Sequence, residues 1–159
     1  MQNNEDGTFS FDPGSDFDDL ANGETRDVTF SYTATDSHGA ESNSGTVTVT
    51  VTGTNDQPTL TVTPATGDLT EGNGAATLSD SGTIDFDDLD ASDAVTVSAS
   101  YNGDIAWSGG TLDPALATAL IAGFDVDQDS WDYSASENLD FLAEGETITL
   151  SFHVVATDD

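Results

Sequence analysis

The sequence contains no cysteine and no lysine, and its single basic residue is Arg26. The lack of cysteine excludes a disulfide framework and a zinc site built on thiolates. Against that one base stand 31 acidic residues, so the net charge is -30 at pH 7. A chain this acidic repels nucleic acid and anionic membrane surfaces. No apolar run approaches the length of a membrane span. We therefore expect neither nucleic acid nor membrane insertion.

The excess of negative charge predicts a need for cations from solution, because self-repulsion disfavours a compact chain. Hard divalent cations prefer oxygen ligands, and calcium outside cells fits this need. Hydrophobic residues make up only 35% of the 159 residues. That share is low, but it suffices for one or two small domains with modest cores.

An internal duplication links the two ends of the chain. The segment LANGETRDVTFSYTATD at 20–36 matches LAEGETITLSFHVVATD at 142–158 at a constant offset of 122, with 9 of 17 residues identical. Duplication over such a span is typical of a repeat array. By the same offset, the counterpart of the segment 45–52 would lie at 167–174, beyond Asp159. We therefore interpret the chain as part of a tandem repeat.

Alternation of apolar and polar residues predicts β-strands along most of the chain. The run TVTVTVT at 46–52 alternates without a break, as a half-buried strand does. Short strands separated by turn-forming residues favour an all-β, antiparallel sandwich of immunoglobulin type. Further strands are expected at 59–63, 81–86, 94–100 and 130–134. The expected core of the sandwich at 57–159 consists of Leu60, Val62, Ile84, Phe86, Val95, Val97, Leu150, Phe152 and Val154.

One short helix is also expected. Asp113 is suited to cap its start, Pro114 suits the first helical position, and Gly123 can end the helix-forming run ALATALIA. We expect this helix to be a short insertion in the β fold. Earlier in the chain, the turn-rich segment TGTNDQP at 52–58 ends a strand and marks a boundary.

These motifs carry a family resemblance. The segment from DGTFSF through TGTNDQP, at 6–58, resembles the C-terminal half of a VCBS repeat. LTEG at 69–72, followed by SGTIDFDDLDASD, resembles the opening of the next repeat. The resemblance covers nearly the whole chain. It implies that residues 1–56 end one cadherin-like repeat and that residues 57–159 form the next repeat without its last strand.

The resemblance implies a function as well. VCBS repeats stand in tandem in large secreted bacterial surface adhesins, so we expect a calcium-rigidified structural repeat at the cell surface, with neighbouring repeats as partners. The alternative is an adhesin module that binds a glycan or peptide, for which Trp107 in GDIAWSGG is the candidate contact. An enzyme is not expected, because neither His38 nor His153 has a recognisable nucleophile partner.

A calcium site is expected at the joint between the two repeats. By analogy with cadherin modules, Asp88 and Asp90 match the Asp-x-Asp pair in the loop after the second strand. The same analogy implies that acidic residues flank the sixth strand. The other reading of these residues is turn chemistry or a solvated acidic loop. The expected ligands are Glu24, Asn55, Asp56, Asp88, Asp90 and Asp158.

Two further questions stay open at this point. Asp125, Asp127 and Asp129 have the spacing of an EF-hand loop, but Ser130 and Ser136 replace its glycine and its final glutamate. The missing last strand of the second repeat would leave an open sheet edge. Either the chain tolerates the gap, or the strand at 46–52 fills it within one chain or between chains.

Overall fold

The computed structural model describes residues 1–4 and 6–159. The chain divides into two compact units, each described here by itself. Unit 1 comprises Met1–Gln57 and Asp88–Asp93, and unit 2 comprises Pro58–Asp87 and Ala94–Asp159. The division after Gln57 falls next to the boundary expected from the sequence. The loop at 88–93 belongs to unit 1, although its sequence lies within the second repeat.

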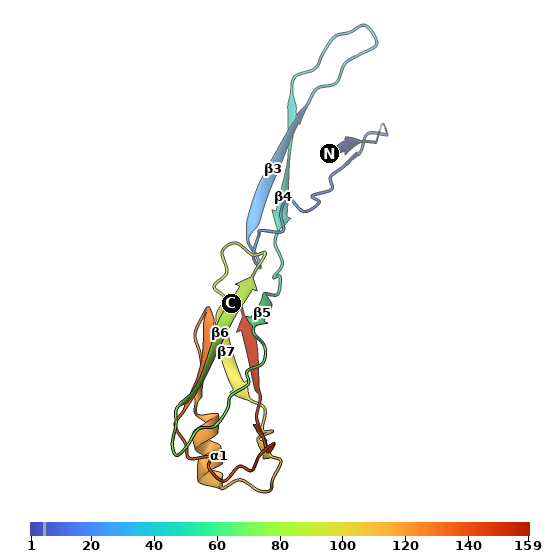
Figure 1. Ribbon diagram of the computed structural model, residues 1–159. Coiled ribbons are helices and arrows are strands. Elements are labelled where there is room, and N and C mark those ends of the chain that lie inside the picture. Colours follow the sequence, from blue (N-terminus) through green and yellow to red (C-terminus); the bar gives the residue numbers. More distant parts are fainter. Residues whose placement is uncertain (5) are drawn as a thin grey trace. The chain divides into compact units, whose positions relative to one another are not determined.

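Unit 1 is built from two antiparallel hairpins, and β3 with β4 forms the long one (Figure 1). Val28 and Phe30 of β3 lie opposite Val49 and Val47 of β4, as the alternation predicts. Leu20 and Ala21 are its buried hydrophobic residues. The strands are β1 (Gln2–Asn3), β2 (Phe9–Ser10), β3 (Thr25–Tyr32) and β4 (Gly45–Thr52).

Unit 2 contains a four-stranded sheet in the order β5-β6-β10-β9 and the two-stranded sheets β7-β12 and β8-β11. All pairs are antiparallel. The rings of Phe124 in β9 and Phe152 in β12 stack at 4.2 Å, which joins two of these sheets. The strands are β5 (Thr59–Thr63), β6 (Leu78–Asp87), β7 (Thr96–Tyr101), β8 (Ala106–Trp107), β9 (Phe124–Val126), β10 (Ser130–Ala135), β11 (Ile148–Thr149) and β12 (Phe152–Thr157).

The predicted class, all-β and antiparallel with one short helix, is confirmed. The finer assignment to an immunoglobulin- or cadherin-like sandwich stays a prediction. The helix is α1 (Pro114–Ile121), and it begins as expected: Asp113 Oδ1 accepts hydrogen bonds from the backbone N–H of Ala115 (2.9 Å) and Leu116 (3.2 Å). Such a cap satisfies N–H groups that have no partner within the helix.

The helix contributes to the core of unit 2. Leu120 is only 3% exposed and forms a buried cluster with Ala135 and Leu139. Leu78, Leu116 and other half-buried side chains pack around this cluster. Figure 1 shows α1 at one end of the strands of this unit. The helix lies between β8 and β9, as expected, but Leu120 is absent from the expected core because the alternation that defined that list counts only strand residues.

The core list itself needs one correction. Ile84 is 2% exposed, as expected, but Phe86 is 37% exposed. The β10–β6 ladder ends at Thr83, and one further hydrogen bond joins the Ile84 N–H to the Asp129 carbonyl (2.8 Å), so at Phe86 the strand β6 is paired with β5 alone. Phe86 therefore lacks a neighbour on one side. The seven other predicted core residues are half-buried: Leu60, Val62, Val95, Val97, Leu150, Phe152 and Val154.

Candidate metal centre

The duplicated segments form the same turn in both units. In unit 1 the Ala21 N–H donates to Glu24 Oε2 (3.2 Å), and the Glu24 N–H donates to the Ala21 carbonyl (3.0 Å). In unit 2 the Ala143 N–H donates to Glu146 Oε2 (3.0 Å), and the Glu146 N–H donates to the Ala143 carbonyl (2.9 Å). Each glutamate therefore closes its own turn, so one oxygen of Glu24 already has a structural role.

The loop at residues 88–93 is anchored in unit 1 by hydrogen bonds. The Asp56 N–H donates to Asp90 Oδ2 at 2.7 Å, and the Ala91 N–H donates to the Asp19 carbonyl at 3.3 Å. Within the loop, the Asp90 N–H donates to Asp88 Oδ1 at 3.0 Å. Aspartate commonly forms such a turn with a backbone N–H two residues on. The arrangement places the backbone of Asp56 against the Asp90 carboxylate, and the backbone of Asp90 against the Asp88 carboxylate.

Two carboxylate oxygens of this loop are buried without a hydrogen-bond partner. They are Asp88 Oδ2 and Asp90 Oδ1. Asp90 is 2% exposed, and among residues 1–4 and 6–159 it is the only charged residue that is buried. Leaving a buried polar group unsatisfied costs about 1–3 kcal/mol, and more when the group is charged. These two oxygens are therefore available as ligands for a cation.

No lysine or arginine of the chain is available to neutralise the loop. Arg26, the only such residue, donates to both carboxylate oxygens of Asp19, at 3.0 and 2.7 Å. These hydrogen bonds lower the pKa of Asp19. A bidentate arginine–carboxylate pair of this kind is a strong, geometrically defined interaction. The sequence did not predict that Arg26 pairs with Asp19. The signal for such a pair was that Arg26 is the only basic residue among many acidic ones.

The other expected ligands lie in different surroundings. Asn55 is exposed and its Nδ2 donates to the Asp56 carbonyl at 3.3 Å. The backbone carbonyl of Glu24 accepts a hydrogen bond from the Gly53 N–H (2.8 Å), and Gly53 lies close to Asp56 in the sequence. Asp158 belongs to unit 2, where it directly follows β12 and is half-buried. In the described part of the chain, no three acidic or histidine side chains form a ready metal-binding group.

The acidic run at 125–129 has an architecture unlike that of an EF-hand. It connects β9 to β10 in an antiparallel hairpin, and the Asp127 N–H donates to the Ser130 carbonyl at 2.8 Å. Asp125, Asp127 and Asp129 are all exposed. Helices flank the loop of an EF-hand, whereas strands flank this one.

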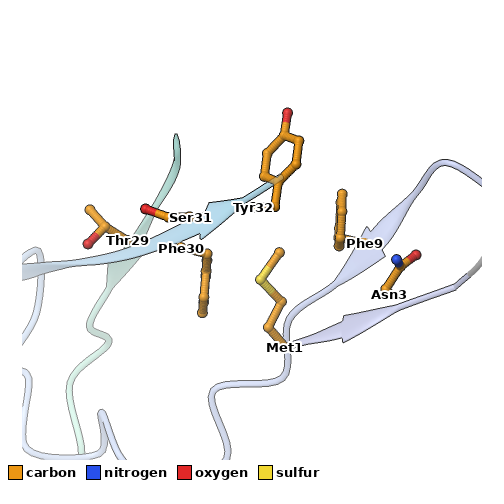
Figure 2. Close-up of a pocket in the computed structure, with 7 residues that line it drawn as sticks. All are labelled: Met1, Asn3, Phe9, Thr29, Phe30, Ser31 and Tyr32. Carbon is orange, nitrogen blue, oxygen red and sulfur yellow. The ribbon is translucent and has the colours of Figure 1, made fainter. Parts of the chain in front are cut away.

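Trp107 and His153, which were considered for ligand binding and for catalysis, both lie in strands of unit 2. Trp107 Nε1 donates to Glu146 Oε2 at 3.2 Å, and its ring meets that of Phe141 edge-on at 4.9 Å. His153 is exposed on β12 opposite Ser100 of β7. An open hollow of about 450 Å³ lies in unit 1, and Figure 2 labels Met1, Phe9 and Tyr32 among the residues that line it.

Comparison of the sequence with protein-family models and with curated proteins finds no match. Within the described residues, no helix is both long and apolar enough to cross a membrane.

Proposed function

We propose that the chain is a calcium-binding structural repeat of a secreted bacterial cell-surface adhesin. One observation carries the proposal: two buried carboxylate oxygens, on Asp88 and Asp90, have no hydrogen-bond partner in a chain whose only arginine is already paired. A divalent cation is the ligand that such oxygens lack. The resemblance to VCBS repeats, whose modules bind calcium, favours the same conclusion.

Calcium fits the donor set better than a transition metal does. The chain has no cysteine, and neither of its two histidines lies in the 88–93 loop. Calcium takes six to eight oxygen ligands, including carboxylates, backbone carbonyls and water. Asp88 and Asp90 would supply the buried carboxylates and Asp56 a third. Glu24 and Asn55 are further oxygen donors of unit 1, while Asp158 stays a ligand implied by the resemblance alone.

The expected consequence of calcium binding is mechanical. The 88–93 loop belongs to unit 1 but is continuous in sequence with β6 and β7 of unit 2. An ion that anchors the loop therefore restrains chain segments that connect the units. We expect the connection to be flexible in chelator, where the acidic side chains repel one another, and stiff in calcium. This response suits a surface-exposed structural repeat.

The proposal is tested by thermal unfolding in calcium, in magnesium and in chelator. A ligand present at 100 times its Kd contributes about 2.7 kcal/mol to stability, so the melting temperature in calcium should rise clearly. The double variant Asp56→Ala/Asp90→Ala should lose most of that rise. The control Asp85→Ala/Asp132→Ala removes the same charge from exposed strand positions of unit 2 and should keep it.

Either of two results would overturn the proposal. One is a melting temperature of the unmodified chain that is the same in calcium and in chelator. The other is a calcium-induced rise of equal size in the site variant and in the control variant, which would trace the effect to general screening of charge.

A further inference from the structure

Asparagine followed directly by glycine occurs three times in the chain, at 22–23, 73–74 and 102–103. In such a pair the backbone nitrogen of the glycine can attack the side-chain carbonyl carbon of the asparagine, because glycine has no side chain in the way. Asparagine is for this reason among the thermolabile residues of proteins. The three pairs have the same chemistry, so a difference in their reactivity comes from the structure around each of them.

The three pairs also share their local conformation. Each glycine has a positive φ, which is 80° at Gly23, 69° at Gly74 and 78° at Gly103. Apart from the adjacent residues, no described atom lies within 4 Å of the position that a Cβ would take at any of them. All three asparagine residues are exposed. The glycine conformation, crowding and exposure therefore do not distinguish one pair from another.

Hydrogen-bond partners do distinguish the three pairs. The Gly23 N–H donates to the Gly53 carbonyl at 3.2 Å, and a neutral carbonyl does not take up a proton at neutral pH. In the third pair the asparagine side chain itself is held, because Asn102 Nδ2 donates to Ser151 Oγ at 2.7 Å. Of the three glycines, only Gly74 has its N–H bonded to a carboxylate in the described part of the chain.

The carboxylate on Gly74 belongs to Asp140. The Gly74 N–H donates to Asp140 Oδ1 at 2.8 Å. A general base has to lie within about 2.6–3.2 Å of the atom whose proton it removes, and Asp140 meets this condition. The Asp140 N–H in turn donates to Asn138 Oδ1 at 2.9 Å, which helps to fix the position of the base. The Asn73 side chain forms no hydrogen bond to another described residue, so it can turn its carbonyl carbon towards the Gly74 nitrogen.

We propose that Asn73 is a site of self-catalysed deamidation, with Asp140 as the general base. The Gly74 nitrogen forms a bond to Cγ of Asn73 and passes its proton to Asp140 Oδ1. The bond between Cγ and Nδ2 of Asn73 then breaks, and the leaving nitrogen takes the proton back from Asp140 and departs as ammonia. Water opens the resulting five-membered imide at either carbonyl, which leaves aspartate or isoaspartate at position 73.

The modification changes the segment that connects β5 to β6. Hydrogen bonds tie this segment to the residues that follow β10: the Gly74 N–H donates to Asp140, and the hydroxyls of Thr77 and Ser136 lie 2.9 Å apart. The product carries a new carboxylate close to Asp140, and like charges repel each other. In isoaspartate the backbone also runs through the former side chain, which displaces the Gly74 N–H. The reaction therefore breaks the bond to Asp140 and loosens this segment irreversibly.

The test follows deamidation at each of the three sites by peptide mapping and mass spectrometry, in the folded chain kept at neutral pH. Asn22 and Asn102 are controls within the same molecule. The variant Asp140→Asn keeps a hydrogen-bond acceptor for the Gly74 N–H but removes the base. The matched control Asp132→Asn removes the same charge from an exposed strand position of unit 2. A second measurement follows the unmodified chain unfolded in urea, where the base no longer lies beside the reacting nitrogen.

A positioned general base contributes about 10²–10⁴-fold, so we expect Asn73 to react at least about tenfold faster than Asn22 or Asn102 in the folded chain. Asp140→Asn should slow Asn73 at least about tenfold and leave the other two sites unchanged, whereas Asp132→Asn should change none of them. Asn73 should also react more slowly in urea than in the folded chain. The proposal is overturned if Asn73 is no faster than the other two sites, if Asp140→Asn leaves its rate unchanged, or if unfolding accelerates it.

Discussion

Replacing Asp90 by asparagine should change the stability of the chain in opposite directions with and without calcium. The Asp90 side chain is 2% exposed, Oδ2 accepts a hydrogen bond from the Asp56 N–H at 2.7 Å, and Oδ1 has no partner. In chelator the carboxylate is thus a buried, half-satisfied charge. The asparagine side chain of the variant keeps the shape and the acceptor but removes the charge.

The size of the effect follows from the burial of this group. The variant keeps a buried polar atom at the position of Oδ1 but removes the charge, and an unsatisfied charged group costs more than the about 1–3 kcal/mol of a neutral one, so in chelator Asp90→Asn should stabilise the chain by about 1 kcal/mol. Each kcal/mol shifts the melting temperature by about 2–8 °C for domains of 60–250 residues. In calcium the same variant loses a charged ligand and should be less stable than the unmodified chain.

Differential scanning calorimetry in calcium and in chelator measures both signs. Glu41→Gln is the matched control, because it removes one charge from an exposed side chain of the same unit and should shift neither melting temperature by more than a small amount. The reasoning is refuted if Asp90→Asn shifts the melting temperature in the same direction in both buffers.

Three further predictions follow from the fold. Leu120→Ala should destabilise unit 2 by about 2–5 kcal/mol in chemical unfolding, whereas Leu69→Ala, at an exposed position, should change little. Gly53→Ala should disrupt unit 1, measured by circular dichroism, because its Cβ would lie 2.1 Å from the Leu20 carbonyl oxygen. Hydrogen bonds from Ser151 lower the pKa of Asp104 below its ordinary 3.8, so the stability deficit of Asp104→Ala should be present above about pH 4 and disappear as the pH falls through the lowered pKa in melts across that range.

Strand positions were predictable because alternation is a local property of the chain. The strand expected at 59–63 is observed as β5 (Thr59–Thr63), and the run at 46–52 lies within β4 (Gly45–Thr52). The helix was equally predictable, since its cap, its first proline and its helix-forming run are all local signals. Local physics therefore sufficed for the class of fold and for most element boundaries.

Burial was less predictable because it depends on which strands lie beside each residue. Phe86 has the same alternation as Ile84, yet only Ile84 is buried, because the Ile84 N–H still bonds to the Asp129 carbonyl just before β10 (2.8 Å), whereas Phe86 lies beyond that contact. The central role of Leu120 depends on packing between the helix and residues around 135–139. The pattern of residues within the helix segment does not predict that Leu120 packs against Ala135 and Leu139.

The candidate metal centre was predictable in its residues but not in its contacts. Sequence motifs singled out Asp56, Asp88 and Asp90, and the resemblance suggested their role. The hydrogen bond from the Asp56 N–H to Asp90 Oδ2 and the burial of Asp90 required the structure, because they arise from the way the 88–93 loop joins unit 1. The role of these residues as calcium ligands stays a prediction.

The most direct test of the account is a crystal structure of the chain grown in calcium. The account predicts an ion bound by Asp88 Oδ2 and Asp90 Oδ1, the two buried oxygens without hydrogen-bond partners, at about 2.3–2.6 Å from each. It is contradicted if that structure shows calcium at other acidic residues only, with both oxygens hydrogen-bonded to protein groups or to water.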